Sequence, residues 1–466
     1  MRMTIRPKTP QPLDIATLIE QYLKKKGVPK SKREELRPAV ALFAQQRQDL
    51  SRVQTNNPRA CDVLHKYLEQ VTAVGEAFQI GQGGMEVSFV WNDSFDPKEK
   101  TTQTCLAFER AALHFNIAAM LTALAADQSR NDLEGLKLSF QYFTQAAAIF
   151  SHIQSSMSAE LLKPISADLS VEGLALCHAT CVAQAQECFY ERSVKSGASP
   201  GLLAKIAAGV VQCYKRMASA AAAPQISSAL HATWGIFARF NVALYTGEME
   251  FQMAAHLHKI PPEGAEVDPL ADPEVVDEAN LKLGDSVARL NKAQDASATA
   301  KKELDKFQKF VKDPDLERKL GLLNKGIGYH LRVTKAENDT VYFQRVPEPG
   351  SLSDLLLEMK EVVKEPPIED VLRPFSNHEG MPAGLLSLLE LGRLASTPDF
   401  AVPPPAAVPA PAPPSTPPAV QPVQPPVYAA PPVRPLHTSR ACFVCVGLLL
   451  CESSAPVRAD ALASRS

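Results

Sequence analysis

The feature that most constrains this fold is the stretch from Phe108 to Ile153, which reads as two apolar helices joined by a short polar turn. In its first half the large apolar residues recur at steps of three and four: Leu113, Ile117, Met120, Leu121 and Leu124. In its second half the same steps connect Phe140, Phe143, Ala147 and Phe150. Such spacing gives each helix an apolar stripe that favours burial. The intervening AADQSRNDLEG predicts a helical hairpin, and a hairpin with so few reactive side chains is typical of a scaffold.

Composition indicates a globular protein with no bulk attraction to nucleic acid. The chain has 466 residues, of which 45% are hydrophobic and 21% charged, and its formal net charge is −2. Nucleic-acid binding favours a distinctly basic domain, so we expect no nucleic-acid partner. One local basic cluster spans Lys24 to Lys26 and Lys30 to Arg33. We interpret it as a solvated helix end, in preference to a membrane- or phosphate-binding patch.

Targeting and cysteine patterns predict a cytoplasmic protein. No apolar core follows the charged start MRMTIRPKTPQPL, so this segment does not resemble a secretory signal. No apolar run reaches the ~18 residues that a membrane-spanning helix needs. Five cysteines fall within apolar helical patterns, as buried free thiols do in a reducing compartment: Cys105, Cys177, Cys181, Cys188 and Cys213.

The rest of the ordered region is predicted to be mainly α, with one strand. Alternating apolar residues from Met85 to Trp91 predict that strand, after a turn rich in glycine. Residues 261–278 contain four prolines and seven acidic residues and are interpreted as a surface insertion. After Val341 the helical signal weakens to an extended arm with one short helix. Helical patterns cover residues 13–80, 101–217, 226–256, 279–311 and 316–336.

A proline-rich tail follows the ordered region. Residues 403–435 contain 15 prolines in 33 positions, a composition that predicts disorder because too little apolar surface can be buried. This segment includes a PPxY motif formed by Pro425, Pro426 and Tyr428. Proline pre-orders the polyproline II helix that WW domains bind, and a minimal PxxP at residues 432–435 adds a weaker SH3-type candidate. Possible partners are therefore WW- or SH3-domain proteins such as a ubiquitin ligase.

The sequence offers no catalytic, cofactor or metal motif. It lacks GxxxxGK[ST], GxGxxG, HExxH and GxSxG patterns. Cys177 and Cys181 lie one helical turn apart, but apolar neighbours favour a packed core over a metal site. Near the end of the chain, Cys442, Cys445 and Cys451 belong to an apolar run of ten residues, 442–451. They are a weak metal or redox candidate, and lipidation or no role at all are the alternatives.

Six short motifs, in order and spacing, resemble the Bro-one (Alix-type) domain family over about residues 3–375. The resemblance implies a banana-shaped, mainly α-helical domain with a tetratricopeptide-like helical core and a small N-terminal β-sheet. Residues 376–402 would then form a linker with a short helix, before the proline-rich segment 403–435 and a tail, 436–466. The motifs are WNDSF at 91–95, FER at 108–110 with FNIAA at 115–119, EGLK at 134–137, AAAIF at 146–150, AQAQE at 183–187, and Tyr342 with Arg345-Val346-Pro347.

The family resemblance also implies a binding patch for the C-terminal amphipathic helix of the filament-forming ESCRT-III subunit. Leu202 and Ile206 match its two principal apolar contacts, Phe189 a neighbouring apolar position, and Lys137 a polar contact. Leu133 stands where the family has a carboxylate, which puts that polar contact in doubt. The residues alone favour full burial of the helix that begins after Ser199, since it is apolar on two faces. Tyr342 matches a tyrosine that serves in the family as a kinase-linked docking site.

The functional expectation is a non-enzymatic ESCRT adaptor in multivesicular body sorting and endosomal protein transport. The resemblance implies a cytoplasmic protein that is recruited peripherally to endosomal membranes. The alternative is a signalling scaffold of the same fold, in an ambient-pH response or linked to Rho. A protease or GTPase that co-purified in place of endosomal proteins would favour that alternative.

Overall fold

A computed structural model describes residues 3–52, 59–260, 282–376 and 382–396. The insertion at 261–278, the proline-rich segment 403–435, and the tail at 436–466 with Cys442, Cys445 and Cys451 lie outside the described residues. Helices dominate the described residues, as predicted. The helices are α1 (Ile15–Lys25), α2 (Lys30–Asp49), α3 (Arg59–Ala77), α4 (Leu106–Asp127), α5 (Leu133–His152), α6 (Val171–Lys195), α7 (Pro200–Ala221), α8 (Ser228–Leu230), α9 (Ile236–Leu257), α10 (Leu283–Phe307), α11 (Pro314–Glu337), α12 (Ile368–Ser376) and α13 (Ala383–Ser396).

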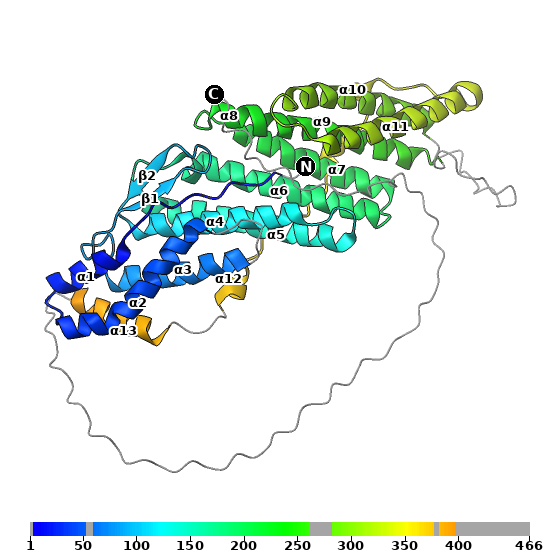
Figure 1. Ribbon diagram of the computed structural model, residues 1–466. Helices are drawn as coiled ribbons and strands as arrows, with labels where there is room; N and C mark the ends of the chain where they lie inside the picture. Colours follow the sequence, from blue (N-terminus) through cyan, green and yellow to red (C-terminus); the bar gives the residue numbers. More distant parts are fainter. Residues whose placement is uncertain (1–2, 53–58, 261–281, 377–381, 397–466) are drawn as a thin grey trace, which may run out of the picture.

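The hairpin predicted at Phe108 to Ile153 is present as α4 and α5. Asp132 caps α5, because its side chain accepts a hydrogen bond from the backbone N–H of Gly135. From this hairpin onward, α4, α5, α6, α7, α9, α10 and α11 each pack against the next helix in a tetratricopeptide-like stack. Figure 1 shows the resulting elongated, curved body, with α1, α2 and α13 near one end and α10 and α11 at the other. One large apolar core runs through the stack.

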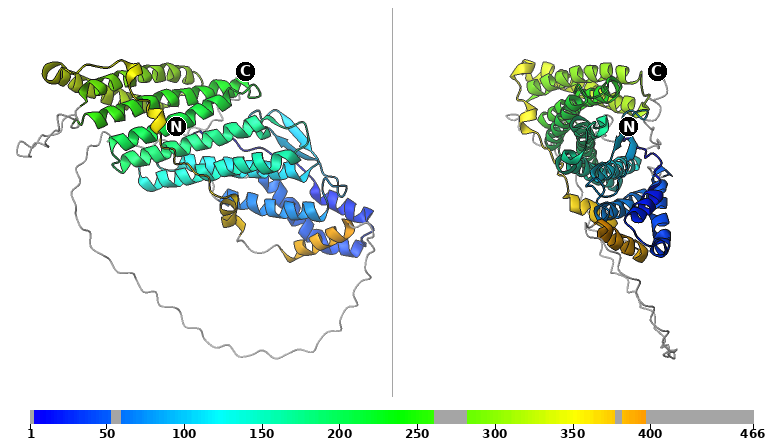
Figure 2. Two further views of the ribbon diagram at one scale, coloured as in Figure 1. Left: turned by 180° about the vertical axis from the view of Figure 1, so that it is seen from behind. Right: turned by 90° about the vertical axis from the view of Figure 1, so that its left-hand side faces the viewer.

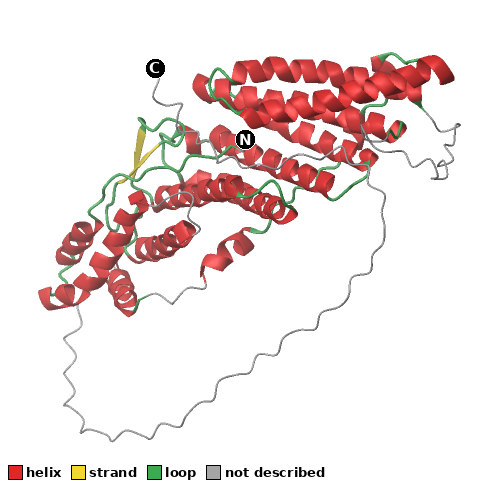
Figure 3. Ribbon diagram, turned by 45° about the vertical axis from the view of Figure 1, so that its right-hand side comes forward, coloured by secondary structure: helices red, strands yellow, loops and turns green. Residues whose placement is uncertain are grey.

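The small sheet is a two-stranded antiparallel hairpin of β1 (Phe89–Asn92) and β2 (Lys100–Gln103), in which Phe89 pairs with Gln103. Figure 3 shows this hairpin in yellow among the red helices. The strand predicted at Met85 to Trp91 therefore begins four residues later than expected. The alternation of apolar residues still predicts which side chains are buried, since Met85, Val87, Phe89 and Trp91 all are. An extended segment with one buried face has this pattern whether or not a neighbour pairs with it.

The segment predicted as a linker, residues 376–402, contains the expected short helix, but this helix belongs to the packed body. Helix α13 packs against α2 and α3 and buries Leu385, Leu388 and Leu389. Its last turn is tied to α1 and α3, because Ser396 Oγ lies 3.1 Å from Tyr22 Oη and 3.1 Å from the carbonyl oxygen of Ala77. The compact region thus extends past the predicted boundary at residue 375 to Ser396.

Candidate functional site

The four predicted patch residues lie on three neighbouring helices of the stack: Lys137 on α5, Phe189 on α6, and Leu202 and Ile206 on α7. Leu202 is 36% exposed and Phe189 is half-buried, so both can contact a partner. Ile206 is only 1% exposed and belongs to the core, so this structure does not present it on the surface as the prediction expected. The sequence-based preference for burial of this helix was correct for Ile206 and wrong for Leu202.

A segment from late in the chain crosses α7 next to Ile206. We call residues 355–365 the strap; they comprise a 3₁₀ turn, Leu355–Glu358, and an extended stretch after it. The backbone N–H of Lys360 donates to the carbonyl oxygen of Lys205 at 2.8 Å. Figure 2 shows this part of the chain running past α7 towards α12. Because Lys205 precedes Ile206 on the helix, the strap lies beside the position that was predicted to be open.

Two features of α6 and α7 hold the strap in place. The buried amide of Gln186 donates from Nε2 to the carbonyl oxygen of Lys360 at 2.9 Å and accepts at Oε1 from the N–H of Val362 at 3.0 Å. On α7, a Cβ at Gly209 would lie 2.5 Å from the same Lys360 oxygen, so only glycine fits beneath the strap. Glycine in a helix interior costs about 1 kcal/mol relative to alanine, and the close approach of the strap explains its presence.

Exposed and half-buried apolar side chains of α5, α6, α7 and the strap define what we call the apolar surface. It consists of Leu133, Phe140, Phe189, Leu202 and Met359. Leu133 is 45% exposed and Met359, in the strap, is 43% exposed. Phe140 and Phe189 are half-buried, with ring centroids 6.3 Å apart. The start of α5, the end of α6 and the start of α7 meet at one end of the three helices, because consecutive helices run antiparallel.

The sequence-based interpretation missed three members of this surface, namely Leu133, Phe140 and Met359. Leu133, Lys137 and Phe140 stand at i, i+4 and i+7, so they share one face of α5, and that spacing could have identified the face. Leu133 was considered only as the loss of a carboxylate, whereas its exposure makes it an apolar contact. Met359 had no local signal, because its position depends on the strap.

The charged groups on this face are largely neutralised within the chain. Lys137 Nζ lies 3.2 Å from Glu134 Oε1, and Lys205 Nζ lies 3.0 Å from Glu358 Oε2. All four side chains are well exposed, so each pair contributes little, on the order of 0–1 kcal/mol. The surface therefore presents an apolar strip flanked by paired charges, which suits the apolar face of an amphipathic helix.

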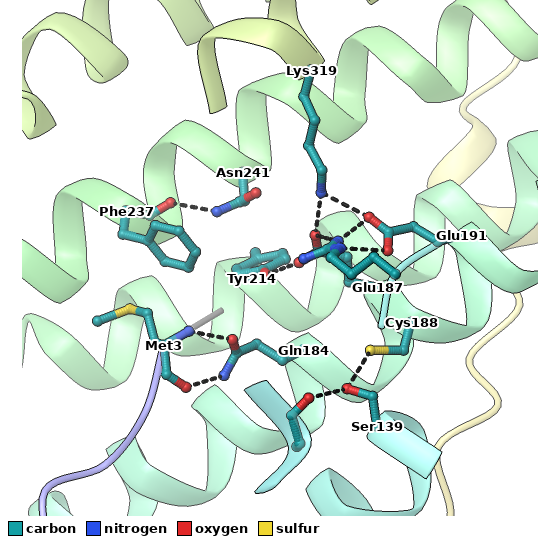
Figure 4. A network of polar contacts seen from close by, with 12 residues as sticks. Met3, Ser139, Gln184, Glu187, Cys188, Glu191, Tyr214, Phe237, Asn241 and Lys319 are labelled. Carbon is teal, nitrogen blue, oxygen red and sulfur yellow. Dashed lines mark hydrogen bonds and ion pairs between the residues drawn. The ribbon is translucent and has the colours of Figure 1, made fainter. Parts of the chain in front are cut away.

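A buried ionic network centred on Glu187 of α6 connects the helices that carry this surface (Figure 4). Glu187 accepts from Arg130 at 2.8 Å and from Lys319 of α11 at 2.6 Å, and the hydroxyl of Tyr214 on α7 also donates to it. Lys319 additionally lies 2.8 Å from Glu191. Burial alone would raise the pKa of Glu187, but Lys319 and Arg130 outweigh it and hold that pKa well below its usual range. The network joins α6, α7, α11 and the α4–α5 turn.

The other predicted positions that the structure describes do not belong to the apolar surface. Tyr342 is half-buried at the end of a turn that follows α11. Pro425, Pro426 and Tyr428 lie outside the described residues. Cys177 and Cys181 are buried, and burial raises the pKa of both thiols, which disfavours the thiolate that a metal needs. Across the described part of the chain, no group of three or more potential metal ligands is found.

No helix among the described residues is long and apolar enough to cross a membrane. Comparison with known proteins then identifies the fold. A family model described as "BRO1-like domain" matches residues 3–384. The chain is 30% identical over 317 residues to the vacuolar-sorting protein BRO1 of Arabidopsis thaliana, covering 67% of this chain and 34% of the relative. It is 24% identical over 377 residues to the ALG-2 interacting protein X of Dictyostelium discoideum, covering 80% of this chain and 44% of the relative.

Solved structures agree with the sequence matches. The ALIX BRO1–CHMP4C complex superimposes with a TM-score of 0.64 at 19% identity, covering 78% of this chain and 95% of that one. A structure described as the basis for endosomal targeting by the Bro1 domain gives 0.63 at 19% identity, covering 84% and 99%. Against the full relatives the chain spans between a third and a half of their length, 34% and 44%. The resemblance inferred from the motifs is thus confirmed, and the chain belongs to the family of proteins with a BRO1-like domain.

Proposed function

We propose that this chain is a non-enzymatic adaptor of the ESCRT-associated vacuolar and endosomal sorting system. Its apolar surface binds the C-terminal amphipathic helix of a filament-forming ESCRT-III subunit. The observation that carries the proposal is the exposed strip of Leu133, Leu202 and Met359 beside the half-buried rings of Phe140 and Phe189. Related BRO1 proteins named for vacuolar sorting, and a BRO1 domain solved with CHMP4C, support it.

The geometry fits reversible capture of a helix. Each exposed leucine or methionine is already more than half covered, so its complete burial contributes about 1 kcal/mol. A few such contacts, with two phenylalanine rings at their centre, suit an affinity that is roughly micromolar. An adaptor that captures a filament subunit and then releases it works in this range.

The remaining parts of the proposal concern the chain beyond the apolar surface. The PPxY motif of Pro425, Pro426 and Tyr428 recruits a WW-domain protein, such as a ubiquitin ligase. The protein is cytoplasmic and is recruited to endosomes. Tyr342, at the end of the turn that follows α11, is a modification site.

The decisive experiment measures binding of the full chain to a labelled C-terminal helix peptide of an ESCRT-III filament subunit, by fluorescence anisotropy. Leu202→Asp removes an apolar contact and forces a carboxylate to be desolvated, so we expect affinity to fall at least about tenfold. Leu42→Asp is the matched control, because Leu42 is 49% exposed on α2, a helix that carries no part of the apolar surface. Equal affinities for the two variants, both with wild-type thermal unfolding, would refute the site.

A further inference from the structure

The strongest unexplained feature outside the apolar surface is the turn between α1 and α2. Residues 20–37 hold seven basic and three acidic side chains, a local charge of +4 in a chain whose net charge is −2. The turn itself is well defined: Gly27 has φ +78°, and its N–H donates to the carbonyl oxygen of Lys24 at 3.0 Å. We call residues 24–33 the basic tip. It lies near one end of the elongated body in both Figure 1 and Figure 2.

The three nearby acids do not neutralise the basic tip. Glu20 pairs with Arg33, while Glu34 and Glu35 pair with lysines of α2, Lys30 at 3.7 Å and Lys32 at 2.8 Å. Lys24 and Lys25 are exposed and form no ion pair with the described residues. Lys26 lies over the ring of Tyr22, 5.7 Å from its centroid. A surplus of exposed positive charge therefore remains on this turn.

The cations at the end of α1 stabilise that helix, whereas the cations at the start of α2 destabilise theirs. Lys24 and Lys25 end α1, where positive charge is favoured by the helix dipole. The first turn of α2, however, contains Lys30, Lys32 and Arg33 and no acidic residue, and its N-cap, Pro29, makes no side-chain cap. Cations at a helix N-terminus oppose the dipole, and acids are preferred there. The ion pairs with Glu20, Glu34 and Glu35 offset this unfavourable placement only in part. A charge pattern that opposes the local structure in this way indicates a binding role.

The neighbouring helix α13 ends against α1 and carries an exposed apolar side chain in its last turn. The hydrogen bond between Ser396 and Tyr22 holds the last turn of α13 against α1. In that turn Arg393 is exposed and Leu394 is 48% exposed. A leucine at the same end of the body as a cluster of cations matches the interface of an anionic bilayer, where cations meet headgroups and an apolar side chain enters the acyl boundary. A turn between two helices suits a flat partner better than a peptide, which needs a groove.

We propose that the basic tip, with Leu394, is a contact site for anionic membrane surfaces. It places one end of the elongated body against the bilayer, while the apolar surface on α5–α7 lies farther along the stack and stays open to a protein helix. This site does not depend on the proposed ESCRT-III interaction, so either can fail without the other.

The test is flotation of the full chain with vesicles of phosphatidylcholine alone or with phosphatidylserine added. We expect binding only to the anionic vesicles, weakened by salt. The triple variant Lys24→Glu, Lys25→Glu, Lys30→Glu should bind at least about tenfold more weakly, since each cation near such a surface contributes on the order of a fivefold gain. The matched control is Lys302→Glu, Lys309→Glu, Lys312→Glu, which makes the same charge change at exposed lysines of the opposite end.

Three outcomes would overturn the proposal: equal flotation with both vesicle types, an equal loss in the two triple variants, or no loss in the tip variant. The first outcome would show that binding does not require anionic lipid. The second would show that binding depends on the net charge of the protein and not on the basic tip. Lys30→Glu alone separates binding from folding, because an acid in the first turn of α2 should leave the melting temperature unchanged or raise it while binding falls. Leu394→Asn should also weaken flotation, whereas Leu386→Asn, nearer the start of α13, should not.

Discussion

The α carbon of Gly209 faces the carbonyl oxygen of Lys360 so closely that a Cβ at this position would lie 2.5 Å from that oxygen. This contact joins residues 151 positions apart and lets the strap lie directly on α7. It also sets which part of α7 is open to a partner, because the strap covers the helix beyond Leu202. The shape of the apolar surface therefore depends on one glycine.

Gly209→Ala should destabilise the protein although alanine is the better helix former. Alanine gains about 1 kcal/mol in helix propensity, but its Cβ must push away a backbone oxygen that also accepts from Gln186. We expect a net loss of about 1–3 kcal/mol, typical of overpacking, measured by urea unfolding. Gly328→Ala on α11 is the control: nothing lies within 4 Å of its Cβ, so it should gain about 0.5–1 kcal/mol. Similar stabilities for the two variants would mean that the strap is not held as described.

Glu187→Gln tests the ionic network that joins α6, α7 and α11. The neutral amide leaves Lys319 and Arg130 without one carboxylate partner in a buried site, so we expect a loss of about 3 kcal/mol at pH 7. Glu34→Gln, which removes an exposed pair with Lys30 at 3.7 Å, should cost less than about 1 kcal/mol. Urea unfolding of both variants measures the difference.

The same residue predicts a pH dependence. The pKa of Glu187 is lower in the folded state than in the unfolded chain, so its contribution is complete above the unfolded value, about 4.3, and is lost as pH falls through the lowered folded value. The stability difference between wild type and Glu187→Gln should therefore be constant from pH 7 to about 5 and shrink below about 4. A difference that stays constant throughout the acid range would show that the carboxylate is not held charged by its partners.

The helical hairpin and the buried faces were predictable because they depend on local spacing. The steps of three and four in α4 and α5 express burial directly, and Phe115 and Phe150 meet across the hairpin as that pattern requires, with ring centroids 5.4 Å apart. The alternation at Met85 to Trp91 likewise predicted the buried side of an extended segment. It could not predict where pairing begins, because pairing depends on β2 and not on the residues of β1.

The candidate site was predictable only in part, because its boundary is set by contacts distant in sequence. Nothing around Ile206 indicates that residues 355–365 return to cover α7. The relevant signals are single residues, Gly209 in a helix interior and Gln186 on an apolar helix, and their meaning appears only with Lys360 in place. The docking of α13 on α2 and α3 was missed for the same reason, since its apolar stripe does not specify its partner.

Leu133→Asp should separate binding from stability. Leu133 is the first residue of α5, where a negative charge interacts favourably with the helix dipole, so the melting temperature should be unchanged or slightly higher. The exposed leucine belongs to the apolar surface, so affinity for the ESCRT-III helix peptide should fall about tenfold. Wild-type affinity in this variant would remove the start of α5 from the binding site and confine the site to α6, α7 and the strap.

Ile206→Ala and Leu202→Ala should differ in kind, although the two residues are one turn apart on α7. Ile206 is 1% exposed, and its truncation leaves a cavity in the core, which should cost about 2–4 kcal/mol of stability in urea unfolding. Leu202 is 36% exposed, so its truncation should cost less than about 1 kcal/mol while it weakens binding of the helix peptide severalfold. For Ile206→Ala, affinity measured under conditions where the variant remains folded should stay near wild type. A large loss of affinity in a fully folded Ile206→Ala protein, with wild-type binding by Leu202→Ala, would instead mean that the strap moves aside and that the partner binds beneath it.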